Sequence, residues 1–498
     1  MNQLCPGTFR TGQSVRWGVP QSRVTLAIVL LLTAWFLFVA HDGLHASFAA
    51  DDMQAIHTYW KPSPWRVLTS QFLLWRGYWR PAVALFYLPI YYTRGLDSAP
   101  YHALLLFLLW IGAYQLYRLA RALGSDEWTS AAAAFIACYH GGMANLYYNT
   151  VYVGDVLCGI FYWSALALYA RVRARGSLLA GRQTAAFLGL YLCALNSKEM
   201  ALTFPAMILA YEWLFHKRPP LRWKDAVAWL RGPGRGFWQA ALLDAICLYG
   251  KAAGSYGLMK NNPAYQPVYS WARLADFQER YLSNMFYQVY RFDGFATGAI
   301  WAAATYFAWR RNRPILRFCW IYVWLSPIPI EFLAGREQAN LYVTLGGWAV
   351  FAATLFTDFI RSAARVVSGE PLFRRLELPY VRALLYAAGI ILAAWGTWSY
   401  KETWVVPTIP KLSPLTAEVI DQFHKAGPRV GPGATVVFLD DPWPGGFDMA
   451  MIAELWFRDR KARVFLNRAT PLTEAQIAKA DAVFTWKDGA LVQVAGSH

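Results

Sequence analysis

Apolar residues in this chain gather into long runs that carry almost no charge, and short polar segments separate these runs. A helix of roughly 20 apolar residues is long enough to cross the hydrocarbon core of a bilayer. The pattern therefore predicts an all-α polytopic membrane bundle. The shortest predicted span, residues 183–196, is the one that its length supports least. The eleven predicted spans are residues 24–40, 100–123, 129–148, 155–172, 183–196, 200–215, 236–253, 295–309, 315–332, 339–360 and 381–400.

The first run follows a basic tail, residues 1–23, and is either a cleaved signal peptide or a retained anchor. Small residues that resemble a cleavage site, 46–50, lie well beyond the end of the apolar run, which favours an anchor. The predicted transmembrane domain is then 24–400. Its first loop, 41–99, contains an apolar stretch, 81–96, that is too short to span and is interrupted by Pro89. We expect this stretch to form a helix in the membrane interface.

After the last predicted span the pattern changes. A Pro-rich linker, 401–432, leads into a segment where short strand-like and helical stretches alternate. This alternation predicts a small α/β domain over 433–498. The expected strands are 435–440, 463–466 and 482–486, and the expected helices are 447–458 and 474–480. The loop from Asp440 to Gly446 follows the first strand, where either a ligand or ordinary turn chemistry would explain it.

Positive charge is concentrated in one set of loops. The formal net charge is +17, which by itself would fit nucleic-acid binding. If the N-terminus is cytoplasmic, the predicted cytoplasmic segments hold about half of the 47 Lys and Arg residues but only a sixth of the 30 Asp and Glu residues. This asymmetry follows the positive-inside rule. It predicts that loop 41–99 and the C-terminal domain are extracytoplasmic, and it argues against a nucleic-acid partner.

Familiar metal and cofactor motifs are missing from the sequence. The six cysteines show no CxxC or Cys/His spacing, so neither a disulfide framework nor a zinc site is supported. The sequence also has no GxGxxG, Walker A or HExxH pattern. We expect no metal and no cofactor.

Two adjacent acids, Asp51 and Asp52, lie about ten residues beyond the first apolar run. A carboxylate at the membrane surface can accept the proton of a hydroxyl that attacks an activated sugar. A phosphate leaving group departs without a protein acid, so one base is sufficient. The alternative is that one aspartate caps a helix beginning near Met53 and the other is solvated.

Charged residues near other predicted span ends are candidates for binding a phosphate. Lys198 and Glu199 stand between two spans with almost no loop, where the lysine can pair with a lipid phosphate or the pair can simply mark a turn. His102 and His140 either hydrogen-bond a phosphate or sugar, or are packed. Arginine suits phosphate because of its forked donors, but it also anchors helices at the interface. The arginine candidates are Arg80 and Arg336.

Taken in order, these segments resemble the GT-C superfamily of integral-membrane glycosyltransferases. The sequence is most similar to the protein O-mannosyltransferases and the transmembrane-plus-TPR mannosyltransferases, although no TPR array follows. It also departs from them at Gly141, where relatives usually have Pro, and in having Asp-Asp rather than Asp-Glu. The matching segments are Asp51-Asp52, Tyr78-Trp79-Arg80-Pro81, Gly95-Leu96 through Tyr101-His102, Phe135 through His140, Leu195 through Glu199, and Arg336 through Tyr342.

The resemblance implies that the first extracytoplasmic loop carries the catalytic base and that the donor is a polyprenyl-phosphate sugar. Asp51 or Asp52 would be the base. The implied substrate-binding residues are Arg80, His102, His140, Lys198, Glu199, Arg336 and Tyr342. We expect a multi-pass protein of the bacterial inner membrane that transfers one sugar, with inversion, to an extracytoplasmic protein, glycan or lipid hydroxyl. The alternatives are a lipid flippase or transporter, or a non-catalytic scaffold whose C-terminal domain recruits partners.

Overall fold

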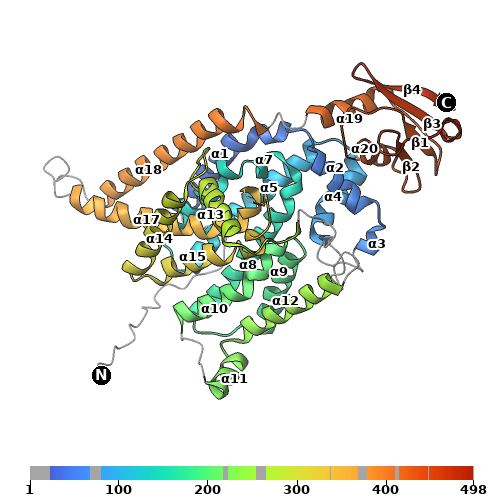
Figure 1. Cartoon of the computed structure of the whole chain (residues 1–498). Coiled ribbons are helices and arrows are strands. Elements are labelled where there is room, and N and C mark those ends of the chain that lie inside the picture. The colour runs from blue at the N-terminus through green and yellow to red at the C-terminus, as the bar shows by residue number, and fades with distance from the viewer. Residues whose placement is uncertain are drawn as a thin grey trace.

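The computed structural model describes most of the chain, and Figure 1 shows its arrangement. Tyr78, Trp79 and most of the basic tail lie outside the described residues. The described residues are 23–67, 80–216, 222–253, 265–336, 338–367, 378–409, 414–446 and 448–496.

Helices make up the larger part of the molecule, residues 23–405. Three long helices form its centre: α5 (Ala99–Ala122), α8 (Val153–Ala174) and α17 (Tyr342–Val367). Each packs against several neighbours, and α5 and α8 pack against each other. The other main helices are α1 (Arg23–Ala40), α6 (Glu127–Cys138), α9 (Gly181–Leu195), α10 (Phe204–Phe215), α11 (Trp223–Arg231), α12 (Arg235–Ala253), α13 (Trp271–Met285), α14 (Gly294–Arg310), α15 (Pro314–Leu325) and α18 (Leu378–Tyr400).

A helix lies at each of the eleven predicted spans. Within the described residues, five helical segments are long and apolar enough to cross a membrane. The chain is therefore an integral membrane protein. The remaining predicted spans coincide with shorter or less apolar helices. The five segments are Thr25–His45, Ala99–Ala122, Thr150–Ala174, Gln338–Val367 and Tyr380–Val405.

Two predicted spans are interrupted. Helix α6 ends at Cys138, ten residues before the predicted end of its span, and the chain continues through the short turn η3 (Gly141–Met143). A Cβ on Gly142 would lie 1.9 Å from the carbonyl oxygen of Asn284, so only glycine allows this close backbone approach. The span 315–332 breaks near Pro327, because proline cannot donate the hydrogen bond that would continue α15. A separate turn, α16 (Ile328–Glu331), follows.

The space between the central helices is filled by aromatic side chains. Tyr342, the first residue of α17, is fully buried and packs against Trp163 of α8. A Cβ at Gly112 or Gly159 would clash with the Tyr342 ring. These two glycines therefore let α5 and α8 close around the tyrosine.

Short helices follow α1 on the side of the molecule that carries the C-terminal domain (Figure 1). The stretch with Pro89, predicted as an interfacial helix, forms α4 (Pro81–Arg94), which packs against both α2 and α8. Proline is tolerated at the first position of α4 because that residue has no intrahelical partner for an N–H group. The other short elements here are η1 (His41–His45), α2 (Ala50–Trp60) and α3 (Pro64–Val67), with α7 (Asn145–Tyr148), η4 (Thr150–Tyr152) and η5 (Glu199–Thr203) nearby in the fold.

The C-terminal segment forms a four-stranded sheet in the order β2-β1-β3-β4, in which β1 runs parallel to both β2 and β3 and β4 runs antiparallel to β3. All three predicted strands and both predicted helices are present. The sequence did not predict β4, nor α19, which lies within the predicted linker and packs against β4 and α20. The elements are α19 (Pro414–Ala426), β1 (Thr435–Phe438), α20 (Asp448–Phe457), β2 (Arg463–Leu466), α21 (Glu474–Ile477), β3 (Ala482–Lys487) and β4 (Ala490–Gly496).

Candidate active site

The two adjacent aspartates occupy the first turn of α2 but face different surroundings. Asp52 is fully buried, and its two carboxylate oxygens accept hydrogen bonds from the Ala49 backbone N–H (2.8 Å) and the Thr150 hydroxyl (2.7 Å). Burial raises the pKa of Asp52 to about 7, despite these hydrogen bonds. Asp51 is exposed. Of the two aspartates, Asp52 therefore caps the start of the helix, and Asp51 faces solvent.

Arg80 lies at the start of α4 and forms an ion pair with Glu199. The Arg80 guanidinium is 2.8 Å from Oε2 of Glu199, and the Lys251 ammonium is 3.1 Å from Oε1. Burial favours the neutral form of Glu199, but the charges of Arg80 and Lys251 outweigh it and hold the pKa of Glu199 well below its usual value. Two cations around one carboxylate leave net positive charge at this point.

Lys198, next in the chain to Glu199, reaches a different acid. Its ammonium lies 2.8 Å from Asp155 of α8 and 3.0 Å from the Asn340 side-chain oxygen. The Asp155 side chain is almost fully buried, and its second oxygen has no hydrogen-bond partner among the described residues. The buried acid fixes the direction of the lysine side chain.

Arg336 stands in the segment between α16 and α17. Its guanidinium lies 4.3 Å from the centre of the Tyr265 ring, a cation–π distance. Its Nε is buried and makes no hydrogen bond within the described part of the chain. Neighbouring backbone is tied to the loop before α13, since the Val268 N–H donates to the Phe332 carbonyl.

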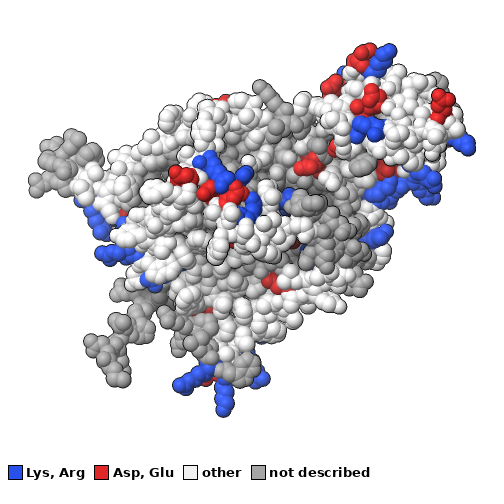
Figure 2. Space-filling model, in the orientation of Figure 1, with Lys and Arg blue, Asp and Glu red and all other residues white. Residues whose placement is uncertain are grey.

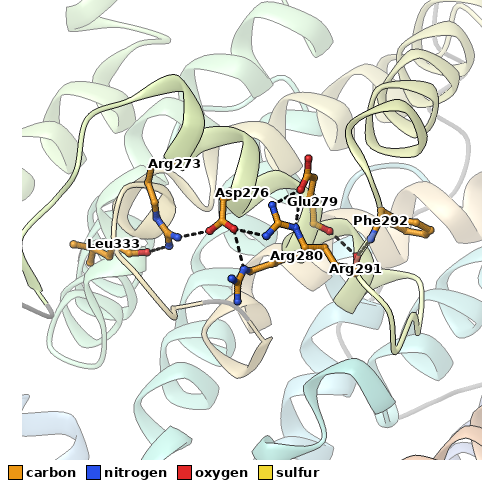
Figure 3. A network of polar contacts seen from close by, with 8 residues as sticks. Arg273, Asp276, Glu279, Arg280, Arg291, Phe292 and Leu333 are labelled. Atoms are coloured by element: carbon orange, nitrogen blue, oxygen red, sulfur yellow. Dashed lines mark hydrogen bonds and ion pairs between the residues drawn. The ribbon is translucent and has the colours of Figure 1, made fainter.

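Helix α13 supports the same segment with a charged network on its outer face (Figure 3). Asp276 is central, because it accepts from Arg273, Arg280 and Arg291. Arg273 also donates to the Leu333 carbonyl, three residues before Arg336. On the face shown in Figure 2, charged side chains gather over α13, around α11 and on the C-terminal domain.

The short turn η4, which ends at Tyr152, packs against both α2 and α8. Tyr152 lies within electrostatic range of Asp51, Asp155 and Arg336. From Asp52 a second chain of contacts runs through Thr150 to the Tyr87 hydroxyl (3.2 Å), whose ring stacks on Tyr59. The Arg80 backbone N–H then donates to the Tyr59 hydroxyl. The start of α2 and the basic residues predicted from distant parts of the sequence are therefore parts of one connected region.

Comparison with known proteins identifies the fold. No protein-family model matches the sequence, and no curated protein sequence matches it either. Two solved structures superpose on 89% of the chain, each at 12% identity and a TM-score of 0.50. One is the archaeal oligosaccharyltransferase AglB from Archaeoglobus fulgidus with an inhibitory peptide and a dolichol-phosphate, and the other is ArnT from Cupriavidus metallidurans in the apo state. Both are GT-C glycosyltransferases.

The chain has a GT-C fold. It spans 64% of the AglB chain and 84% of the ArnT chain. The resemblance inferred from the ordered sequence motifs is therefore confirmed at the level of the fold.

Three of the candidate residues, His140, His102 and Tyr342, are buried in the protein. The His140 ring packs at a tilt against Tyr287, and its Nε2 lies 3.3 Å from the Met285 carbonyl oxygen. His102 is fully buried in the first turn of α5. Tyr342 is the packing residue between α5 and α8 described above. Among the described contacts, none joins these three side chains to Lys198, Arg80 or Arg336.

Several residues of the region were not predicted from the sequence. Lys198 is held by two of them, Asp155 and Asn340. Lys251 pairs with Glu199, and the Thr150 hydroxyl donates a hydrogen bond to Asp52. Asp155 and Lys251 lie in or beside apolar runs, where a charged residue in a membrane protein signals a functional or paired position. That signal was available in the sequence. The hydroxyl of Thr150 and the amide of Asn340 carry no comparable signal, because such residues are common in any polar turn.

The arrangement supplies two kinds of chemistry. An exposed carboxylate can accept a proton from an attacking hydroxyl. Lys198 and Arg336 can stabilise negative charge on a departing phosphate, because both are cationic and partly sheltered from water. Within the described residues, no group of three or more His, Cys, Asp or Glu side chains has metal-binding geometry.

Proposed function

We propose that this chain transfers one sugar from a polyprenyl-phosphate donor to an acceptor hydroxyl on the extracytoplasmic side of the membrane, with inversion. The observation that carries the proposal is that, in a GT-C fold, the turn η4 packs against both α2, which carries the exposed Asp51, and α8, whose Asp155 holds Lys198. Arg336 lies within electrostatic range of Tyr152 in the same turn.

In the proposed reaction Asp51 is the base. The acceptor oxygen attacks the anomeric carbon, its proton passes to Asp51, and the bond from that carbon to the phosphate oxygen breaks with the electron pair leaving on the phosphate. A single displacement from the opposite face inverts the configuration. Asp52 serves instead as a positioning residue, because both of its oxygens are occupied and the side chain is sealed from solvent.

The leaving phosphate is assigned to Lys198 and Arg336. Lys198 is directed by Asp155 and Asn340, and Arg336 retains an Nε donor without a protein partner among the described residues. Arg80 pairs with Glu199 through one guanidinium nitrogen, and its buried Nε has no hydrogen-bond partner among the described residues, so it adds positive charge beside the proposed phosphate site. The dolichol-phosphate named for the AglB structure supports a polyprenyl phosphate as the donor lipid.

The test uses the full-length protein in lipid vesicles with a panel of radiolabelled polyprenyl-phosphate hexoses, pentoses and amino sugars. Membrane extract supplies acceptors, and release of polyprenyl phosphate is measured. Asp51→Asn should lower release by about two to four orders of magnitude, because a positioned base contributes on that scale. Asp421→Asn, which removes an exposed carboxylate of the C-terminal domain, should leave release unchanged. Full activity in the Asp51→Asn protein would overturn the assignment.

The same vesicles separate this proposal from transport. A flippase would move the intact labelled lipid across the bilayer without releasing polyprenyl phosphate. Translocation with no release, for every donor in the panel, would favour that function over sugar transfer.

A further inference from the structure

The C-terminal domain contacts the short helices of the candidate active site mainly through one element, α20. Figure 1 shows α20 beside α2 and α4, at the edge of the sheet that faces the membrane part. Nearly 400 residues separate these elements in the sequence. Their contact is therefore a specific tertiary arrangement and not a consequence of chain connection.

On α2 the contact is an ion-pair cluster. Glu454 of α20 accepts hydrogen bonds from Nε2 of His57 at 2.7 Å and from the Lys61 ammonium. The Glu454 side chain is only 14% exposed. Burial favours its neutral form, but the His57 and Lys61 bonds and charges outweigh this and lower the pKa of Glu454. The Arg460 guanidinium adds a hydrogen bond to the Trp60 carbonyl at 2.9 Å.

On α4 the contact uses aromatic hydroxyls. The buried Tyr91 hydroxyl donates to the Leu455 carbonyl at 2.6 Å, and the Arg458 guanidinium lies 5.6 Å from the Tyr91 ring centre. Arg460 also donates to the Tyr92 hydroxyl at 2.6 Å. A single stretch, residues 454–460, thus contacts the C-terminal ends of both α2 and α4.

The opposite ends of the two helices lie in the candidate active site. Asp51 and Asp52 occupy the first turn of α2, and Arg80 immediately precedes α4. Each helix is short, 11 residues for α2 and 14 for α4, and isolated helices of this length are only marginally stable in water. Their orientation therefore depends on tertiary contacts, and α20 supplies such contacts at the ends remote from the site.

We propose that the C-terminal domain is a clamp that orients α2 and α4, so that Asp51 is held in its reactive position. Glu454 is the central positioning residue of the clamp. Its effect on catalysis rests on the function proposed above, whereas its effect on the order of α2 does not. The domain is thereby assigned a part in the reaction and not the recruitment of a separate partner.

The test measures hydrogen–deuterium exchange of residues 50–60 in the full-length protein in nanodiscs. Glu454→Gln keeps the size of the side chain and removes its charge, and we expect amide exchange in α2 to rise about tenfold. Asp421→Asn is the matched control, because it breaks an exposed ion pair with Lys425 in the same domain. The paired change Glu454→Lys with Lys61→Glu restores the opposite charges and should return exchange towards the parent value.

Donor turnover supplies the catalytic readout. Glu454→Gln should lower kcat about tenfold and leave KM for the polyprenyl-phosphate donor unchanged, because the base is displaced while the phosphate cations are not. The charge-swapped protein should recover most of this loss. A variant that merely reduced the folded fraction would leave kcat per folded protein unchanged.

Exchange and turnover separate the failure of the clamp from the failure of the proposed function. If Glu454→Gln and Asp421→Asn show the same α2 exchange, the clamp is overturned whatever the activity. If exchange rises but kcat is unchanged in a protein that needs Asp51, the clamp exists without the catalytic role, and that part of the proposal is overturned. If Asp51→Asn is fully active, the proposed function fails, and the exchange result still decides the clamp.

Discussion

Adjacent aspartates can have different roles because successive helical residues point about 100° apart. In α2 this rotation turns Asp52 into the protein, under Thr150, and leaves Asp51 at the surface. Burial removes hydration from a carboxylate and so raises its pKa, whereas an exposed carboxylate remains accessible to substrate. Surroundings, and not residue type, therefore separate the proposed base from its supporting neighbour.

A first prediction concerns the stability of α2 as pH changes. The pKa of Asp52 is about 7 in the folded protein against its usual value of 3.8, so the folded state binds more protons between these two pH values. Stability from this group is therefore greatest near pH 4 and falls as pH rises through 7, by roughly 4 kcal/mol at most. Asp52→Asn, which stays neutral, should gain in Tm relative to the parent as pH rises from 4 to 7.

Thermal unfolding of the two proteins in the same detergent, across this pH range, measures the effect. Asp421→Asn, at an exposed position, serves as the control and should run parallel to the parent. A constant difference in Tm between Asp52→Asn and the parent would show that Asp52 is already ionised throughout.

A second residue-scale prediction concerns the phosphate cations. Polyprenyl phosphate without a sugar should raise the Tm of the protein, because a ligand that binds only the folded state stabilises it. Arg336→Gln should remove most of this shift, since the forked donors of arginine are lost. Arg94→Gln, at an exposed position in the last turn of α4, should keep it. An undiminished shift in Arg336→Gln would place the phosphate elsewhere.

At the scale of elements, the site depends on short segments braced by longer ones. Helix α13 is the clearest case, because Arg273 connects its charged network to the backbone that carries Arg336. Burial opposes ionisation of Asp276, but the hydrogen bond from Arg280 and the charges of Arg280, Arg291 and Arg273 lower its pKa. The network is therefore intact above the usual carboxyl pKa and weakens as pH falls below it.

We predict that Asp276→Asn raises KM for the donor several-fold with little change in kcat, because Arg336 loses its support while Asp51 keeps its own. The network is partly exposed, so high salt should screen it and raise KM in the parent as well. Steady-state kinetics at low and high ionic strength measure both effects. Equal KM values for Asp276→Asn and the parent at low salt would contradict the supporting role of α13.

On the scale of the whole molecule, the C-terminal domain and α11 lie at opposite ends (Figure 1). The sequence predicts that the first is extracytoplasmic and the second cytoplasmic. Asp488→Cys, in the turn between β3 and β4, should react with a membrane-impermeant maleimide in intact cells. Arg231→Cys, at the end of α11, should react only after the membrane is permeabilised. The reverse pattern of labelling would place the proposed active site on the cytoplasmic side.

The same scale distinguishes a clamp from a recruiting scaffold. Deleting residues 413–498 should abolish donor turnover in purified, reconstituted protein, because α2 and α4 lose the contacts made by 454–460. Folding of the truncated protein is checked by the Tm shift that polyprenyl phosphate induces. A truncated protein that binds the lipid and turns over at the parent rate would show that the domain only recruits partners.

Much of this architecture could be predicted from the sequence because it depends on local properties. The length and polarity of apolar runs fix where membrane helices lie, and short alternating stretches marked β1, β2 and β3. Helix α19 was not predicted because its Pro-rich start resembles a linker. Strand β4 was not predicted because most of its side chains are exposed, so no apolar run marks it. The candidate acids and cations were visible because charged residues near span ends stand out.

Which of those charges work together was decided only by the tertiary structure. Arg80 meets Glu199 across 119 residues, Lys198 meets Asp155 across 43, and His57 meets Glu454 across 397. Such pairings carry no local signal, because they follow from how helices pack and not from the periodicity of any one helix. The chain alone determined a membrane bundle with an acidic first loop and an α/β tail. Packing determined that Asp52 is buried, that Asp51 is exposed, and that the tail grips the helix carrying both.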